Sequence, residues 1–290
     1  MLLLLAALAL LPVPCRAADW DDPQAYHQAQ DYMLSVINKF RDKKGLQLVQ
    51  LDSAASQVAR DHAQDMFSAD YFSHWDTSGV KPTRRWNLLG GYDSVSENIY
   101  FQQGNGGSVE KVCDAAMKTL MNSDGHRATI MDPAHTHVGL GFAVDSRARR
   151  FYVDQTFVTR AGGDYACPLE AHVGQTVQFS GRFDPQRYEF ENVIMGYEEL
   201  PQPRNKKWLN GSGSYKDADR LVAGYTDNAR LSFNGMATYN NVTCEDGAFT
   251  CDARLDFKGK PGLYYLFLWL RDRQTGKSVV AATATVEARR

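Results

Sequence analysis

The sequence has no block of lysine and arginine, although these residues occur 32 times among 290 positions. They are balanced by 34 aspartate and glutamate residues, which leaves a formal net charge of −2. Proteins that bind nucleic acid usually carry a basic patch or stripe that neutralises phosphates. We therefore expect no nucleic-acid partner. Hydrophobic residues make up 43% of the chain, which is enough for a globular core.

Beyond the first residues, the chain also lacks an apolar run of the ~20 residues that a membrane-spanning helix needs. Residues 1–13 form a shorter Leu- and Ala-rich run, followed by small residues at 17 and 18. This pattern fits a signal peptide over residues 1–18, although a basic start is missing, and a buried helix is the alternative. A lipoprotein site at Cys15 is less favoured, because Val13 and Pro14 replace the usual small residues. We expect a secreted protein, extracellular or periplasmic, without an integral membrane segment.

No C-x-x-C pair suggests a zinc site of the cysteine type. Removal of the leader leaves an even number of cysteines: Cys113, Cys167, Cys244 and Cys251. An even number in an exported chain favours disulfides, and four cysteines allow three pairings. The Asp246-Gly247 pair predicts a hairpin that favours Cys244–Cys251, which would leave Cys113–Cys167. A free core thiol is the alternative for Cys113, on the buried side of a predicted helix.

Three amphipathic patterns predict helices in the first half of the chain: residues 25–44, a helix that starts near Asp52 or Ser53, and a helix after Ser108. Apolar residues then alternate along 138–144, and a charged turn at 145–150 leads to a second strand-like segment. This spacing predicts a β-hairpin. Helices followed by strands predict an α/β or α+β sandwich over residues 19–163.

The second half has a different pattern. Residues 161–164 look like a linker, and no convincing helical pattern follows. Seven short segments read as strands: 173–179, 193–197, 221–224, 230–233, 255–257, 264–270 and 279–286. We therefore predict a smaller all-β domain over residues 164–290, an immunoglobulin-like sandwich.

Three histidines and one glutamate occur in suggestive local contexts. His74 ends the segment 70–74, Glu97 lies in Ser96-Glu97-Asn98-Ile99, His126 follows Gly125, and His137 opens the predicted hairpin. Neutral imidazoles and a carboxylate suit Zn²⁺ and related divalent cations. The pattern predicts that His74, Glu97, His126 and His137 share a cleft that binds Zn²⁺ or another divalent cation. The alternative is a set of polar residues that only hydrogen-bond one another and hold loops.

The order of these motifs resembles the CAP superfamily, which includes cysteine-rich secretory proteins, antigen 5 and plant pathogenesis-related proteins. The similarity covers residues 25–160 and is greatest to the bacterial, SCP-like branch. It implies an α-β-α sandwich with a surface cleft, which carries two His and two Glu in animal and plant members. His74, Glu97 and His137 match three of those positions, and His126 matches the bacterial motif.

Two positions depart from the family pattern. Leu120 stands where many relatives have Trp, and Ser96 stands where Gly is usual before Glu97. Neither change removes a cleft residue, but the missing second Glu weakens any mechanism taken from the eukaryotic branch. The resemblance implies no single activity, because family members have been discussed as peptidases and as lipid or sterol carriers.

Two other histidines are weaker candidates for the site. His62 shares a helical face with Val58 and Met66, which favours a core or boundary position. His135 lies two residues before His137 and is the substitute for it.

The sequence leaves three functional hypotheses. The favoured one is a non-catalytic secreted binding module for a small-molecule or lipid ligand, or for a protein or cell-surface partner. The alternative is a secreted hydrolase or peptidase, metal-dependent or with His74 or His137 as general base and Ser73 or Ser123 as nucleophile. No Gly-x-Ser-x-Gly motif supports that alternative. The third is a structural envelope protein with a vestigial cleft.

Overall fold

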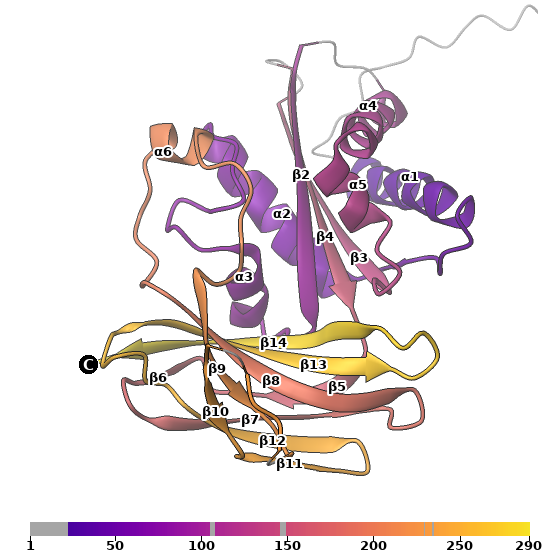
Figure 1. Ribbon diagram of the computed structural model, residues 1–290. Helices are drawn as coiled ribbons and strands as arrows, with labels where there is room; N and C mark the ends of the chain where they lie inside the picture. Colours follow the sequence, from indigo (N-terminus) through magenta and orange to yellow (C-terminus); the bar gives the residue numbers. More distant parts are fainter. Residues whose placement is uncertain (1–22, 105–107, 146–148, 229, 234) are drawn as a thin grey trace, which may run out of the picture.

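A computed structural model describes residues 23–104, 108–145, 149–228, 230–233 and 235–290 (Figure 1). The expected signal peptide and Cys15 lie outside these residues. In the described part, no helix has the length and apolar character needed to cross a bilayer.

The N-terminal unit has three layers, with a mixed sheet between two layers of helices. Its helices are α1 (Pro23–Asp42), α2 (Ser53–Ser68), α3 (Pro82–Leu88), α4 (Val109–Asn122) and α5 (Asp124–Ile130). Its strands are β1 (Gln50–Leu51), β2 (Ser94–Gln103), β3 (His137–Asp145) and β4 (Arg150–Thr159), in the order β1-β3-β4-β2. The α-β-α sandwich expected from the sequence is confirmed.

Both faces of this sheet follow from the alternation of side chains along the strands. Val138, Leu140 and Phe157 point to the core formed with α1 and α4. The opposite face carries Gly139 and Gly141, and a Cβ on either would come within 2.1 Å of the α2 backbone. These glycines therefore let α2 lie directly on the sheet, which fixes the height of every α2 side chain above it.

The C-terminal unit is rich in strands. It contains β5 (Gly162–Ala166), β6 (Glu170–His172), β7 (Thr176–Phe183), β8 (Tyr188–Glu198), α6 (Lys206–Asn210), β9 (Arg220–Tyr225), β10 (Ala237–Tyr239), β11 (Val242–Glu245), β12 (Ala248–Arg254), β13 (Gly262–Asp272) and β14 (Ser278–Arg289). One sheet has the order β10-β9-β8-β13-β14-β6, and the other has the order β11-β12-β7-β5. Buried residues of both sheets, such as Phe179 and Leu266, form one core.

The strand-rich prediction is confirmed, but an immunoglobulin-like arrangement is not. The pairs β9–β10 and β6–β14 are parallel. Two predicted strands, 230–233 and 255–257, lie outside any strand, since local bonds such as Leu231 N–H to the Asn228 carbonyl close a turn there. The expected linker at 161–164 contributes residues to β5.

Neither predicted disulfide is present, because Cys113, Cys167, Cys244 and Cys251 are all free thiols. The Cys113–Cys167 pairing is wrong: Cys113 is buried in the core of the N-terminal unit, while Cys167 packs against the core of the C-terminal unit. The predicted hairpin does form between β11 and β12. Its register, however, sets Cys244 opposite Phe249 and Cys251 opposite Val242, so the two thiols are only diagonal neighbours.

The two units meet along α3. Arg84 donates a hydrogen bond to the Thr285 carbonyl at 3.0 Å, and Asn87 donates to the Thr283 carbonyl at 2.9 Å, both on β14. The buried Lys81 forms an ion pair with Glu198 at the end of β8. Tyr265 donates to the same carboxylate at 2.6 Å. A buried polar interface therefore holds the strand-rich unit against the helix that precedes β2.

Candidate functional site

Glu97 is the centre of a buried charged cluster. It lies on β2, faces α2 and is only 4% exposed. Its Oε1 is 2.8 Å from Nδ1 of His74, and its Oε2 accepts from Arg85 and is 3.2 Å from Nδ1 of His62. Burial alone would raise its pKa, but Arg85, His62 and the hydrogen bonds hold the pKa of Glu97 well below its usual value. Glu97 is therefore an ionised carboxylate with both oxygens occupied.

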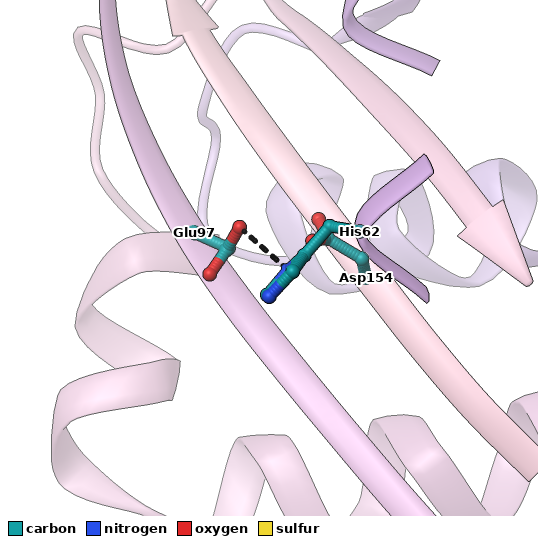
Figure 2. A group of neighbouring side chains, drawn as sticks. All are labelled: His62, Glu97 and Asp154. Atoms are coloured by element: carbon teal, nitrogen blue, oxygen red, sulfur yellow. Dashed lines mark hydrogen bonds and ion pairs between the residues drawn. The ribbon is translucent and has the colours of Figure 1, made fainter. Parts of the chain in front are cut away.

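His62 and Asp154 complete the cluster from α2 and β4 (Figure 2). Nδ1 of His62 is 2.8 Å from Oδ2 of Asp154. Burial and Arg85 oppose protonation of His62, but the two carboxylates outweigh them and raise its pKa to about 9. Burial and the nearby Glu97 raise the pKa of Asp154 to about 7. His62 is therefore a cation at neutral pH and serves as an ionic partner.

The same cluster has the composition of a metal site. One ligand atom from each of His62, Glu97 and Asp154 lies within 4.8 Å of the others. Arg85 and protonated His62, however, already balance the charges of the two carboxylates. A divalent cation would have to displace these positive groups from Glu97 and Asp154. The chemistry of this cluster therefore favours an internally neutral ion network.

His74 extends the cluster beyond Glu97. The ionised Glu97 accepts a hydrogen bond from Nδ1 of His74, so Nδ1 carries the imidazole proton. The Nε2 atom of His74 therefore keeps its lone pair. Metal-binding histidines use this arrangement, in which a carboxylate orients the ring. Burial lowers the pKa of His126 on α5, and an electrostatic interaction with His74 lowers it further. The structure thus brings His74 into contact with Glu97, with His126 within electrostatic range of His74.

The structure does not bring His137 into this group. His137 begins β3, pairs with Val158 of β4, and is separated from Glu97 on β2 by the whole of β4. Its Nδ1 lies 2.9 Å from the Thr136 hydroxyl, and its Nε2 lies 3.4 Å from Arg160.

His135 is not a substitute for His137. Its ring stacks on Phe157 with a centroid distance of 5.3 Å and bonds to the Thr159 hydroxyl at 3.0 Å. Burial lowers the pKa of His135 to about 4. These contacts make it a neutral core residue.

A segment of the C-terminal unit covers His74. The Tyr215 ring lies 4.8 Å from the His74 ring, and its hydroxyl accepts from the Glu97 backbone N–H at 3.3 Å. The Ser73 hydroxyl is 2.8 Å from that of Ser212 and accepts from the Trp75 N–H at 3.0 Å. These bonds engage Ser73 away from the histidines.

Sequence reasoning missed His62 as a charged partner, and it missed Arg85, Asp154 and Tyr215. A signal existed for two of them. Asp154 is the one charged residue in the segment 151–158, and His62 lies on the apolar face of α2. A charged residue in an apolar pattern needs a buried partner. Tyr215 gives no such signal, because it reaches the site from another unit.

Comparison with known proteins identifies the first unit. Residues 34–158 match the family model CAP, the cysteine-rich secretory protein family. The chain carries a bacterial-type CAP domain. It is 31% identical over 121 residues to the uncharacterized protein YkwD of Bacillus subtilis (strain 168), covering 41% of this chain and 44% of that protein. It is also 31% identical over 144 residues to the uncharacterized membrane protein YlbC of the same strain, covering 49% and 37%. The CAP match thus spans less than half of either relative.

Solved structures give matches over a similar share of the chain. An extracellular SCP-domain protein from Bacillus anthracis str. Ames is 25% identical, with a TM-score of 0.39, covering 46% of this chain and 41% of that one. An outer surface protein from Borrelia burgdorferi is 14% identical, with a TM-score of 0.40, covering 46% and 94%.

Proposed function

We propose that this protein is a secreted, non-catalytic binding module whose CAP cleft holds a divalent cation such as Zn²⁺ at Nε2 of His74. One observation carries the proposal: the ionised Glu97 holds Nδ1 of His74 at 2.8 Å, which leaves Nε2 as a free, oriented lone pair. His126 on α5, within electrostatic range of His74, supplies the second imidazole. Solvent or a bound partner completes the coordination.

This proposal gives the four sequence-predicted residues different roles. His74 and His126 are the ligands. Glu97 orients His74 and does not bind the cation, since both its oxygens already accept from protein groups. His137 lies outside the site, since its ring contacts Thr136 and Arg160.

The contacts of Ser73 support binding over hydrolysis. A serine nucleophile needs a general base within hydrogen-bond reach, yet the Ser73 hydroxyl bonds to Ser212 and Trp75. The other candidate, Ser123, stands at the junction of α4 and α5, where its side chain makes no capping hydrogen bond.

Calorimetric titration of the metal-free mature protein with Zn²⁺ tests the proposal. We expect one bound ion per chain, and an affinity at least about tenfold lower in His74→Ala and in His126→Ala. His137→Ala is the matched control and should bind like wild type. Equal affinity in the His74→Ala and wild-type proteins would show that His74 binds no cation. Small-molecule, lipid or protein ligands would then be tested.

A further inference from the structure

The connection between β8 and β9, residues 199–219, leaves the strand-rich unit and crosses the CAP domain, where α6 lies beside α2 (Figure 1). It is fixed at two places. On one side, Leu209 is 1% exposed and packs in a core cluster with Ala63, Met66 and Tyr71. On the other side, the backbone carbonyls of Lys216 and Asp217 accept from Lys81 at 2.7 and 2.9 Å.

Residues 211–216 lie between these anchors, with the sequence Gly-Ser-Gly-Ser-Tyr-Lys. They form no helix or strand, and Gly211, Gly213, Ser214 and Lys216 are exposed. Gly213 has a φ of +68°, and a Cβ there would meet nothing within 4 Å. A short glycine- and serine-rich segment between two firm anchors can change its backbone without disturbing either one.

This segment covers His74 with few contacts. Apart from the Lys216 carbonyl at the second anchor, its hydrogen bonds to the CAP domain are those of Ser212 with Ser73 and of the Tyr215 hydroxyl with the Glu97 N–H. The Tyr215 ring adds contacts to His74 and, at 6.4 Å between centroids, to Trp75. Under this ring the His74 side chain is only 11% exposed. Tyr215 is therefore the side chain that stands between solvent and His74.

We propose that residues 211–216 are a gate over His74, closed in this structure, and that a solute reaches the His74 imidazole only when Tyr215 moves away. The inference rests on the proposed function only for the identity of the solute. Access to His74 can be measured without any cation.

Diethylpyrocarbonate labelling of the mature protein, read by mass spectrometry of the His74 peptide, measures that access. We expect labelling of His74 about tenfold faster in Tyr215→Ala than in wild type, as a closed state becomes open. Tyr239→Ala, which removes an exposed tyrosine from β10, should match wild type. The exposed His172 should label at one rate in all three proteins. Equal His74 rates in Tyr215→Ala and wild type would overturn the gate.

A reversible disulfide, here called the latch, tests the gate independently of whether Tyr215→Ala folds. The Ser73 and Ser212 hydroxyls are 2.8 Å apart, so the Ser73→Cys/Ser212→Cys protein can form a disulfide across the closed gate. The oxidised protein should label His74 about tenfold more slowly than the same protein after reduction. Ser212→Cys alone should show no such difference.

The latch also separates the two proposals. Labelling and Zn²⁺ binding that are both suppressed by oxidation support the gate and the cation site together. If oxidation slows His74 labelling but calorimetry detects no Zn²⁺ binding in the oxidised or the reduced protein, the gate is supported and the cation site is rejected. Labelling that ignores the latch overturns the gate, whatever the zinc titration shows.

Discussion

Glu97 receives positive or hydrogen-bonding groups from three segments that are distant in sequence. His62 comes from α2, His74 from the loop after it, and Arg85 from α3. A single buried carboxylate thus fixes the tautomer of His74 and the charge of His62. Such a group is strongly destabilising when one of its partners is removed, because it leaves an unpaired charge in the core.

The raised pKa of His62 predicts a pH dependence of stability. A histidine whose pKa is 6.5 when unfolded and about 9 when folded contributes stability that is complete below pH 6.5 and lost as pH rises through 9. Asp154 acts in the same direction at lower pH, with a pKa raised from 3.8 to about 7. Over the interval from pH 7.5 to 9 the four cysteines add to the effect of His62, because burial raises the pKa of each thiol in the folded protein.

From the proton that the folded His62 retains, we expect a fall of about 2 kcal/mol in the free energy of unfolding between pH 7.5 and 9, in addition to the contribution of the cysteines. In His62→Gln the fall over the same interval should be smaller by that amount. Urea unfolding at a series of pH values measures both slopes. A wild-type slope that persists unchanged in the variant would assign the effect to other groups.

At the scale of elements, local patterns predicted much of the CAP domain. The pattern over 25–44 corresponds to α1, Asp52 caps α2 through the Ala55 N–H at 2.7 Å, and the third pattern corresponds to α4. The hairpin corresponds to β3 and β4. The strand β2, which carries Glu97, was not predicted. Its sequence shows no clear alternation between apolar and polar residues.

The candidate site was predictable only in part, for a related reason. Motif order brought His74, Glu97 and His126 into consideration, and the structure joins His74 to Glu97 by a hydrogen bond, with His126 within electrostatic range of His74. The position of His137 depends on which strands pair, and local sequence does not specify this: β4 lies between it and Glu97. Tyr215 depends on how a second unit docks, which no local pattern encodes.

The contact between α2 and β3 gives a prediction at this scale. In Gly139→Ala the new Cβ would lie 2.1 Å from the Ala55 backbone, and neither the helix nor the sheet can move away without repacking the core. We expect a loss of about 3 kcal/mol, measured by urea unfolding. Gly125→Ala is the control: it lies in α5 with open space around its Cβ and should be neutral or stabilising by up to ~1 kcal/mol. Equal stability of the two variants would contradict the close packing.

At the scale of the whole molecule, the surroundings of His74 are completed by the strand-rich unit. That unit supplies Leu209 to a CAP core cluster and Tyr215 to the cover of His74. The two units also share Lys81, which pairs with Glu198 and bonds the carbonyls at the end of the gate. The second unit is therefore part of the site architecture, and not merely attached to it.

Two ion pairs between the units allow a matched prediction. The pair Lys81–Glu198 is buried, whereas Lys206–Asp70 is more than half exposed on both sides. Lys81→Met should cost about 3 kcal/mol, because it leaves Glu198 buried with only Tyr265 as a partner. Lys206→Met should change stability by less than about 1 kcal/mol. Thermal and urea unfolding of both variants measure the difference, and similar losses would contradict the buried interface.

The most direct test of the central claim compares the zinc affinities of His74→Ala and His137→Ala by calorimetry. The structure orients His74 through Glu97 and holds His137 against Thr136 and Arg160. The account therefore predicts that binding is lost in the His74 variant and kept in the His137 variant. Binding that survives in His74→Ala, or that disappears in His137→Ala, would contradict it.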